Sequence, residues 1–358
     1  MLLHFIFVLI IISFATGFET SNNDPTLLRS SCQLITDISQ CPSTRIIDLP
    51  DLEGELPLET KVFFIESSGR DHLLHRQACS VESALSVSKT IRSVVTLTAR
   101  QLNLSHNATC QLYSRFNEPR LIFRRVDRAK IFKNTPIQPV FERGDLDRGP
   151  NQIVQNSDAL RLLLIRKYGG WYADLDVVFM QDPSSWQNII TGDHHRVVGD
   201  GSVIGENLNN AVFHFDKGHP YLELCLEQFA INFDPMVRLS GGPYTMSKAL
   251  KKICGMEENS IINLNTFTRD RCRGVGVVKQ HLLYPLGWFE IDVFTSERKS
   301  RSQWAAKYNS SITIHLFNSI AGSDKVVLKP KFYGNDVPAY LYLAERFCPL
   351  CYNSVKRF

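Results

Sequence analysis

The sequence lacks the glycine-rich motifs through which many proteins bind nucleotides. No G-x-G-x-x-G follows the first expected strand, and no G-x-x-x-x-G-K-[ST] is present. Both motifs cradle phosphates with backbone N–H groups, so their absence removes the usual support for dinucleotide-dependent and ATP-dependent enzymes. Internal repeats and low-complexity tracts are also missing. A protein that holds a nucleotide through a metal ion and acidic side chains is the class that the sequence still allows.

The chain also lacks a strong charge of one sign. Its formal net charge is +4, which is too small to indicate a nucleic-acid-binding protein, and no aromatic-rich basic repeat accompanies it. One segment, Glu118–Lys133, is locally basic. Its positive residues are Arg120, Arg124, Arg125, Arg128, Lys130 and Lys133. This segment is either an ordinary solvated face or a surface that contacts membrane head groups.

Closely spaced cysteine pairs with histidines nearby, as in zinc sites, are absent. The pairs that come nearest to such spacing are Cys32/Cys41 and Cys348/Cys351. The chain nevertheless has nine cysteines. Proteins of the secretory pathway keep disulfides and cytosolic proteins rarely do, so this number favours a lumenal or secreted protein.

The pairing of the cysteines does not follow from their spacing. Because nine is an odd number, at least one thiol is free or pairs with another chain. We expect disulfides between Cys79 and Cys110 and between Cys254 and Cys272.

The N-terminal part is expected to lie outside the globular fold. Residues 1–18 are almost wholly apolar and are about as long as the shortest membrane-spanning helix, ~17 residues. They also fit a secretory signal peptide. Residues 19–57 are polar and broken by four prolines, which is typical of a stem. Three N-x-S/T sequons predict surface sites that could carry glycan, at Asn103, Asn107 and Asn309.

The remaining ~300 residues are enough for one large α/β domain or two closely packed subdomains. Lys61–Ile65 is a buried strand pattern, Cys79–Ser88 a helix and Ile91–Thr98 a second strand. This order indicates a parallel, Rossmann-like sheet, which binds ligands at the carboxyl ends of its strands, where Glu66 lies. Further strands are expected at Leu121–Val126, Arg196–Gly199, Ala211–Phe215, His281–Tyr284 and Ile312–Phe317, and further helices at Tyr221–Ile231 and after the turn Ser240–Pro243.

The stretch Asn151–Met180 is the most informative. Apolar residues recur at helical spacing from Ile153 to Tyr168, and Asp158 and Arg161, three residues apart, share a helix face. Gly169-Gly170 is expected to end this helix, because glycine accepts the left-handed conformation found just past helix ends.

The period then changes to two, which predicts a strand over Trp171–Phe179. One face of this strand carries Tyr172, Asp174 and Asp176. Two carboxylates side by side are costly unless a positive charge lies between them. A hard divalent cation with a diphosphate would satisfy them, since magnesium and manganese prefer oxygen ligands. For a bare D-x-D, the competing interpretation is a solvated strand end with ordinary surface acids.

Several ordered motifs resemble one known family. S-D-x-x-R at Ser157–Arg161, followed by Y-G-G-x-Y-x-D-x-D at Tyr168–Asp176, resembles the sugar-binding region of glycosyltransferases whose D-x-D binds a nucleotide-sugar through a metal. Other segments resemble the opening and closing regions of the lactosylceramide 4-alpha-galactosyltransferase and alpha-1,4-N-acetylglucosaminyltransferase family. These segments are Phe63–Ser67, Cys79–Ala84, Cys272–Val275, Tyr284-Pro285 and His315–Asn318.

The resemblance implies a GT-A type fold, a Rossmann-like and mostly parallel sheet flanked by helices, with the D-x-D at a strand end. It also implies a nucleotide-sugar-binding part at 58–224 and a C-terminal part at 225–358 that completes the acceptor and metal sites. Residues 1–18 would then be an uncleaved anchor and 19–57 the stem.

The resemblance further implies the roles of individual residues. Asp174 and Asp176 would be the catalytic carboxylates and would hold Mn²⁺, or Mg²⁺, together with His315. The donor sugar and nucleotide would be bound by Asp158, Arg161, Tyr172, Glu66 and Asn209. For Tyr172, simple packing at a sheet edge is the alternative.

Gly242 and Pro243 occupy the place that lies beside the acceptor in relatives. The chain departs from the family at Gly241, where relatives tend to carry glutamine, and at Phe317, where they carry tryptophan. Phenylalanine keeps an aromatic wall but has no N–H to donate to a phosphate.

The expected activity is a retaining, metal-dependent transfer of galactose from UDP-galactose, in alpha-1,4 linkage, to a terminal galactoside of a glycosphingolipid such as lactosylceramide. The alternatives are transfer of N-acetylgalactosamine or N-acetylglucosamine to a glycolipid or glycoprotein, and a non-catalytic lumenal binding homologue. The expected location is the Golgi membrane, in single-pass type II orientation with a lumenal catalytic domain. No nucleic-acid partner is expected.

Overall fold

The computed structural model describes residues 41, 46–52, 54, 56, 60–116, 119–192, 196–197, 203–204, 207–258, 260, 267–318 and 333–355. The expected anchor at 1–18 and most of the expected stem at 19–57 lie outside these residues. Within the part that is described, no helix combines the length and the apolar character needed to cross a membrane.

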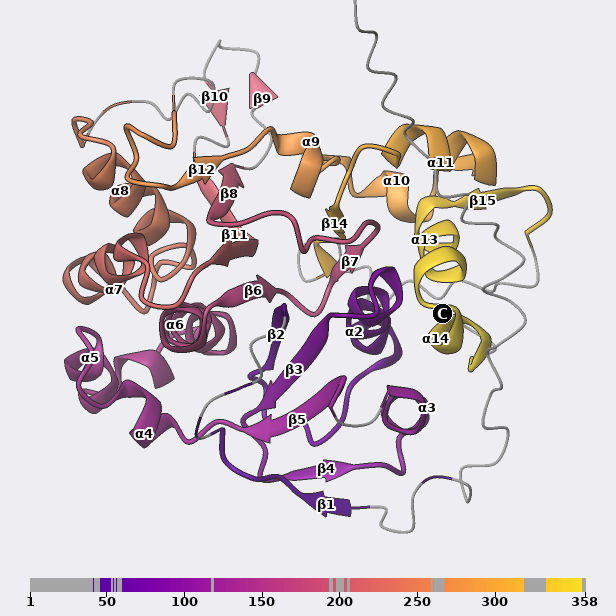
Figure 1. The fold of residues 1–358 in the computed structure, drawn as a ribbon, viewed down its shortest axis with the longest axis horizontal. Coiled ribbons are helices and arrows are strands. Elements are labelled where there is room, and N and C mark those ends of the chain that lie inside the picture. Colours follow the sequence, from indigo (N-terminus) through magenta and orange to yellow (C-terminus); the bar gives the residue numbers. More distant parts are fainter. Residues whose placement is uncertain are drawn as a thin grey trace, which may run out of the picture. The chain divides into compact units, whose positions relative to one another are not determined.

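The central element is a seven-stranded sheet with the order β12-β8-β11-β6-β2-β3-β5 (Figure 1). Only β11 runs antiparallel to its neighbours, and every other pair is parallel. The strands, in that order, are Gly276–Val277, Ile189–Gly192, Leu208–Phe215, Gly170–Ala173, Lys61–Glu66, Arg92–Leu97 and Leu121–Arg125. This arrangement confirms the predicted Rossmann-like, mostly parallel sheet.

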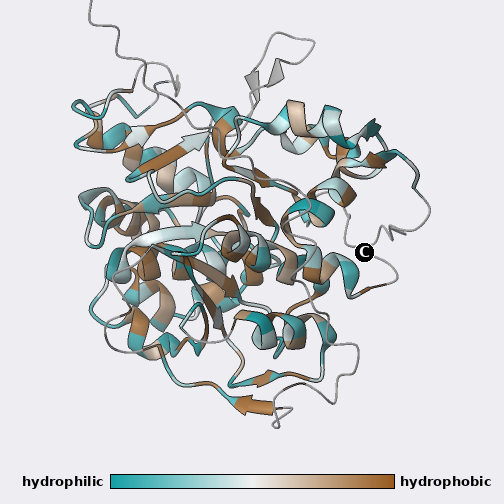
Figure 2. Cartoon of the chain, turned by 45° about the vertical axis from the view of Figure 1, so that its right-hand side comes forward, coloured by the Kyte–Doolittle hydropathy of each residue, from teal (hydrophilic) through white to brown (hydrophobic). Residues whose placement is uncertain are grey.

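Both faces of the sheet are covered, and the sequence of β2 shows why. All six of its residues are buried, as expected for a parallel strand that has no solvated face. Because side chains alternate along a strand, Val62 and Phe64 enter one hydrophobic core while Phe63 and Ile65 enter the other. Figure 2 shows the hydrophobic colour concentrated on the central strands.

Each core has its own set of helices, on opposite sides of the sheet in Figure 1. One set consists of α4 (Arg128–Phe132), α5 (Gln138–Glu142), α6 (Gln152–Tyr168), α7 (Pro220–Asn232) and α8 (Pro243–Ile253). The other consists of α2 (His75–Val87), α3 (Asn107–Phe116), α10 (Asp292–Thr295), α11 (Arg301–Tyr308), α13 (Ala339–Phe347) and α14 (Pro349–Asn353). The predicted flanking helices are thus confirmed.

Four small antiparallel pairs complete the described strands. They are β1–β4 (Ile46–Asp48, Gln101–Asn103), β7–β14 (Val177–Phe179, Thr313–His315), β9–β10 (Arg196–Val197, Val203–Ile204) and β13–β15 (Arg298–Ser300, Asp336–Pro338). Short helical turns lie at Asp145–Asp147 (η2), Gln280–Leu283 (α9) and Trp288–Glu290 (η4).

Two expected strands differ from the structure. The strand predicted over Trp171–Phe179 is two strands, β6 and β7, because the backbone turns between Asp174 and Asp176. The strand predicted at His281–Tyr284 is the helical turn α9, in which the Tyr284 N–H donates to the Gln280 carbonyl over 2.7 Å. Apolar runs of about four residues fit either a strand or a helical turn, so their period does not decide between them.

Three disulfides are present in the described residues. Cys254 pairs with Cys272, as predicted, but the predicted Cys79–Cys110 pair is wrong. Cys110 pairs with Cys41, and Cys79 on α2 pairs with Cys348, 269 residues further along the chain. The second link follows from the packing of α13 and α14 against α2, which a spacing argument could not foresee.

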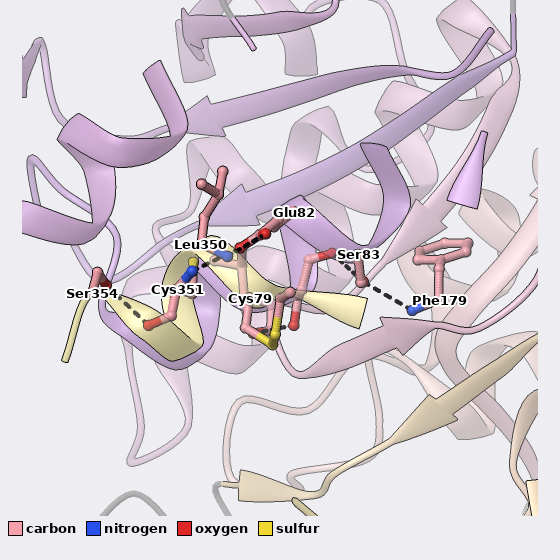
Figure 3. Close-up of a disulfide and its surroundings, with 10 residues drawn as sticks. Cys79, Glu82, Ser83, Phe179, Leu350, Cys351 and Ser354 are labelled. Atoms are coloured by element: carbon pink, nitrogen blue, oxygen red, sulfur yellow. Dashed lines mark hydrogen bonds between the residues drawn. A yellow bond between two sulfur atoms is a disulfide. The ribbon is translucent and has the colours of Figure 1, made fainter. Parts of the chain in front are cut away.

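The C-terminal helix α14 is also fastened by a buried carboxylate. Glu82 on α2 accepts hydrogen bonds from the backbone N–H groups of Leu350 (2.7 Å) and Cys351 (2.9 Å), beside the Cys79–Cys348 disulfide (Figure 3). These bonds satisfy two N–H groups in the first turn of the helix, which have no partner within the helix itself. A polar anchor in an otherwise apolar core thus fixes the C-terminal segment.

Candidate active site

The turn between α6 and β6 delivers the predicted D-x-D to the sheet. Gly169 and Gly170 have φ angles of 66° and 111°, which side chains other than glycine rarely adopt. A Cβ on Gly169 would meet the Lys217 backbone nitrogen at 2.6 Å, and one on Gly170 would meet the Lys61 carbonyl oxygen at 2.8 Å. This pair lets β6 start directly against β2 and β11, and α6 ends just before Gly169, as predicted.

The two aspartates lie where β6 leaves the sheet. The Asp174 N–H still donates to the Ala211 carbonyl on β11 over 2.8 Å, and the Val177 N–H then donates back to the Asp174 carbonyl over 3.0 Å. This closes a tight turn, after which β7 pairs with β14. The turn places both carboxylates near the carboxyl end of β6.

His315, at the end of β14, completes a group of three possible metal ligands. One ligand atom each from Asp174, Asp176 and His315 lies within 4.8 Å of the others, and this is the single such group in the described residues. His315 Nε2 is 3.1 Å from Asp176 Oδ1. Two carboxylate oxygens and an imidazole nitrogen form a donor set that suits Mn²⁺ or Mg²⁺ with further ligands from substrate phosphates. These residues fit a divalent cation.

The backbone after His315 is bent so that it supports Asp176. Phe317 has a φ of 49°, an unusual conformation for a residue other than glycine. The centre of its ring lies 4.0 Å from the centre of the His315 imidazole. The bend lets the Asn318 N–H donate to Asp176 Oδ2 over 2.9 Å, while the Leu316 N–H donates to the Asp176 carbonyl over 2.9 Å. The aromatic wall expected at Phe317 is present.

A second charged group, which α6 contributes, lies next to the metal ligands. Arg161 is 3% exposed, and its Nη2 lies 3.2 Å from Asp158 Oδ1 and 3.1 Å from Asp174 Oδ1. Its Nη1 donates to the Asn210 carbonyl over 2.7 Å, and the Asn210 amide in turn donates to Asp158 Oδ1 over 2.8 Å. The predicted pairing of Asp158 and Arg161 on one helix face is confirmed, and Arg161 joins it to the D-x-D.

Tyr172 lies beneath this network and is buried. Its hydroxyl donates to Asp174 Oδ1 over 2.5 Å, and the Arg161 guanidinium sits 4.4 Å from the centre of its ring. The side chain therefore holds Asp174 and Arg161 in position. Whether it also lines the uridine pocket stays a prediction.

The pKa values of the carboxyls follow their surroundings. Burial raises the pKa of Asp158 to about 6, against the opposing effect of Arg161. Burial also raises the pKa of Asp174, which Arg161 counteracts. For Asp176, the attraction and hydrogen bond of His315 and the Asn318 N–H outweigh burial and lower the pKa. Neighbouring carboxyls with opposite shifts are characteristic of functional sites.

Arg161 keeps its charge in spite of its burial. Burial alone would lower its pKa, but Asp174, Tyr172 and Asp158 outweigh that effect and raise it. A fixed positive charge therefore lies next to the D-x-D.

Of three other predicted contacts, Glu66, Gly242 and Pro243, the structure joins Gly242 to the residues above. Glu66 is the last residue of β2 and is buried, and it accepts from the Ser68 N–H over 2.6 Å and from the Gln77 amide over 3.3 Å. A Cβ on Gly242 would meet Asn210 Nδ2 at 2.2 Å and Asp158 Oδ1 at 2.9 Å, so this glycine packs directly against the Asp158 network. Pro243 follows it as the first residue of α8.

The predicted Asn209 uses its side chain locally, where Oδ1 accepts from the Ala211 N–H over 2.9 Å. Its neighbour Asn210 is the residue that reaches Asp158, although no motif in the sequence indicates it. The register of β11 against β8 shifts between Asn209 and His214, so a period-two pattern could not tell which asparagine faces the site.

Tyr284 was singled out only as part of a motif. Its hydroxyl accepts from the Val212 N–H over 2.9 Å, and its ring centre lies 6.1 Å from that of His315. It therefore joins β11 to the metal-ligand group, a role that a family motif alone could not specify.

The three sequons lie on the outer elements. Asn309 is exposed after α11, whereas Asn103 and Asn107 are half-buried at β4 and at the start of α3. The Asn107 amide donates to the Ser354 carbonyl over 3.0 Å. Glycosylation at these positions stays a prediction.

A carboxylate pair with an imidazole near the carboxyl end of β6, next to a buried arginine, is an arrangement that suits an enzyme acting on a negatively charged substrate through a divalent cation. Family comparisons agree. The family "Glycosyltransferase sugar-binding region containing DXD motif" matches residues 75–193, and "Alpha 1,4-glycosyltransferase conserved region" matches residues 214–355. The two matches together span most of the residues from 75 to 355, and they identify the chain as a glycosyltransferase.

Named relatives cover most of the chain. Lactosylceramide 4-alpha-galactosyltransferase of Mus musculus is 25% identical over 83% of this chain and 76% of its own length. Alpha-1,4-N-acetylglucosaminyltransferase of Homo sapiens is 24% identical over 85% of this chain and 83% of its own length. Among solved structures, the PaToxG glycosyltransferase is 16% identical with a TM-score of 0.41, over 80% of this chain and 90% of that one.

Proposed function

We propose that this glycosyltransferase transfers galactose from UDP-galactose, with retention and in alpha-1,4 linkage, to a terminal galactoside of a glycosphingolipid such as lactosylceramide. The observation that carries the proposal is that Arg161 joins two groups, the set Asp174, Asp176 and His315, and then Asp158. The first group suits a metal-bound diphosphate and the second suits a sugar. The relatives named above support the linkage and the kind of acceptor.

In this proposal, Asp176, Asp174 and His315 hold Mn²⁺. When bound, the ion supplies Lewis-acid chemistry, since it neutralises charge on the departing diphosphate. Arg161 adds a permanent positive charge at the same edge, where a planar guanidinium suits phosphate oxygens. The Asn318 and His315 contacts keep the Asp176 carboxyl ionised, as its lowered pKa indicates.

Asp158 is the residue that we assign to the sugar. Its Oδ1 is occupied by Asn210, but its Oδ2 is buried and has no hydrogen-bond partner among the described residues. A buried acceptor without a partner costs about 1–3 kcal/mol, so a ligand hydroxyl that donates to it would recover that free energy. A hydroxyl group of the donor sugar is suited to this position.

Retention requires that the acceptor attack on the face from which UDP leaves. The acceptor oxygen forms a bond to the anomeric carbon, the bond from that carbon to the phosphate oxygen breaks, and the phosphate oxygen takes the acceptor proton. This sequence needs no enzyme carboxylate as nucleophile. A covalent sugar intermediate on an aspartate or glutamate is the alternative.

Transfer of N-acetylglucosamine or N-acetylgalactosamine is the second candidate, and the human relative supports the former. Both candidates use the same metal and phosphate site, and side chains near the 2-position of the sugar would separate them. A non-catalytic binding role is disfavoured because the complete charged set is present.

We also propose a lumenal, Golgi-membrane location with residues 1–18 as anchor. Three disulfides and three sequons support a secretory compartment. Endoglycosidase sensitivity and protease protection in microsomes test this: a protected, glycosylated chain is expected, and an unglycosylated, protease-accessible chain would contradict it.

The proposed activity is tested with purified full-length protein, lactosylceramide or a soluble lactoside, and a panel of UDP-sugars, with Mn²⁺ or with chelator. We expect galactose transfer that chelator abolishes, and linkage analysis should give an alpha-1,4 product. Transfer from an N-acetylated donor alone would favour the second candidate. Folded protein that neither transfers nor hydrolyses any donor would contradict both.

A further inference from the structure

Exposed large apolar side chains gather on one loop beside the site. Residues 234–244 lie between α7 and α8 and include the first two residues of α8, and we call this segment the 234–244 loop. Its exposed apolar residues and their exposed fractions are Met236 (64%), Val237 (40%), Leu239 (37%) and Tyr244 (40%). At the start of the adjacent helix α6, Ile153 is 51% exposed. Contiguous exposed apolar residues of this kind mark interaction surfaces.

Hydrogen bonds fix the conformation of the loop so that these side chains point outward. The Ser240 hydroxyl donates to the carbonyls of Asp234 (2.7 Å) and Val237 (2.8 Å), and the Thr245 hydroxyl donates to the Ser240 carbonyl (2.7 Å). Gln155 on α6 donates to the same two carbonyls of Asp234 and Val237 over 3.2 and 3.1 Å. The polar backbone is thus satisfied on the inner side, and the apolar side chains are left on the outer side.

The same loop is continuous with the proposed sugar pocket. It contains Gly242 and Pro243, and Gly242 packs against Asp158 and Asn210. Arg238, which is exposed between Val237 and Leu239, is close enough for its positive charge to favour the ionised form of Asp158 and so oppose the rise in its pKa. An acceptor that reaches the donor sugar therefore passes close to these apolar side chains.

We propose that the 234–244 loop rests on the lipid bilayer and presents the site to a glycolipid acceptor anchored there. This inference rests on the proposed function, because it takes the acceptor to be a glycosphingolipid. The head group of such an acceptor is only a few sugars long, so its terminal sugar stays near the membrane surface. A surface beside the pocket must then approach the lipid, and that surface here is apolar.

The composition of the loop fits a bilayer surface better than a protein partner. Met236, Val237 and Leu239 can enter the boundary between head groups and acyl chains, while Tyr244 and Arg238 suit the head-group level. A stable contact with a second copy would need about 800 Å² from each partner, which four side chains fall short of supplying. We therefore assign this surface to the membrane.

Two acceptors that share one head group test the proposal. Full-length M236S/L239S is compared with wild type on a soluble lactoside and on lactosylceramide in phosphatidylcholine vesicles. We expect a fall of tenfold or more in kcat/KM on vesicles, with kcat/KM on the lactoside within twofold of wild type. I46S is the matched control, since Ile46 is 50% exposed on β1, and it should change neither rate. Equal effects on both acceptors, or no effect on either, would overturn the proposal.

A second measurement does not depend on turnover, so it separates this inference from the proposed function. An environment-sensitive fluorophore is attached to L239C and, as control, to I46C, each in a chain that also carries C32S; among the described residues, the free thiols Cys225 and Cys351 are buried. Vesicles should shift the L239C emission to shorter wavelength and leave the I46C emission unchanged. The proposal fails if the L239C emission does not shift, or if lipid-free M236S/L239S changes oligomeric state, which would assign the loop to a second copy.

Discussion

Asp176 is the residue on which the metal-ligand group depends most. It contacts His315 Nε2 through one carboxylate oxygen and the Asn318 N–H through the other. Replacing the carboxylate with an amide keeps its size but removes the negative charge. We expect Asp176→Asn to lower kcat for sugar transfer by roughly 10²–10³, because loss of one preorganised electrostatic group costs about 3–4 kcal/mol.

A matched control for this change is Asp182→Asn. Asp182 is an exposed aspartate six residues further along, and within the described part of the chain it accepts hydrogen bonds from the nearby Ser184 alone. Its loss should leave transfer unchanged. If Asp176→Asn and Asp182→Asn were equally active, while both melted like wild type, the metal assignment would be wrong.

Gly242 tests the proposed sugar pocket without removing a charge. Its missing side chain leaves room for the Asn210 amide and the Asp158 carboxylate, which a Cβ would approach at 2.2 and 2.9 Å. We expect Gly242→Ala to raise KM for the UDP-sugar at least tenfold, because the Asp158–Asn210 bond must shift. Gly334→Ala is the control, since nothing lies within 4 Å of its added Cβ. If Gly242→Ala had the same KM for the UDP-sugar as wild type, the assignment of Asp158 to the donor sugar would be wrong.

The sequence predicted the site residues well where they belong to a motif, and poorly where their contacts depend on the fold. Asp158, Arg161, Asp174, Asp176 and His315 all come together as the family motifs implied. Asn210 was missed because the register of its strand is irregular. Lone polar residues on an irregular strand carry no periodic signal.

Among the elements, α2 and α14 form a contact whose energetics depend on pH. Burial raises the pKa of Glu82 to about 7, although the N–H groups of Cys351 and Leu350 favour its ionised form. The folded state therefore keeps a proton that the unfolded state releases nearer the ordinary value of 4.5. The free energy of unfolding should then fall as pH rises from about 4.5 to about 7, by roughly 3 kcal/mol in total.

Glu82→Gln should remove this dependence, because an amide stays neutral at every pH. We expect urea unfolding of wild type to lose stability between pH 5 and pH 8, and Glu82→Gln to lose much less. At pH 5 the free energy of unfolding of Glu82→Gln should already be lower than that of wild type, since only the amide oxygen can accept, and so only one of the two N–H bonds is kept. Glu142→Gln, at an exposed glutamate on α5, serves as control and should follow wild type. Parallel profiles for wild type and Glu82→Gln would contradict the account of α14.

Element prediction succeeded for long patterns and failed for short ones. The helix from Ile153 to Tyr168 and the buried strand at Lys61 have enough residues for their period to be distinctive. The four residues His281–Tyr284 do not, and they form a helical turn. The break between β6 and β7 was missed because alternation continues across the turn that displays the two aspartates.

For the molecule as a whole, the parallel sheet with helices on both faces followed from the order of strands and helices. What sequence physics alone could not supply was the approach of distant segments. Asp176 meets Asn318, 142 residues away, and Cys79 meets Cys348, 269 residues away. Such contacts depend on the full chain path, and only the family resemblance indicated that His315 would face the D-x-D.

The central claim is that Asp174, Asp176 and His315 bind the donor through a divalent cation. Calorimetric titration of UDP-galactose into the full-length protein, with Mn²⁺ and then with chelator, tests it most directly. We predict binding that requires Mn²⁺ and that Asp176→Asn abolishes. Binding of equal affinity after removal of the metal, or in Asp176→Asn, would contradict the claim.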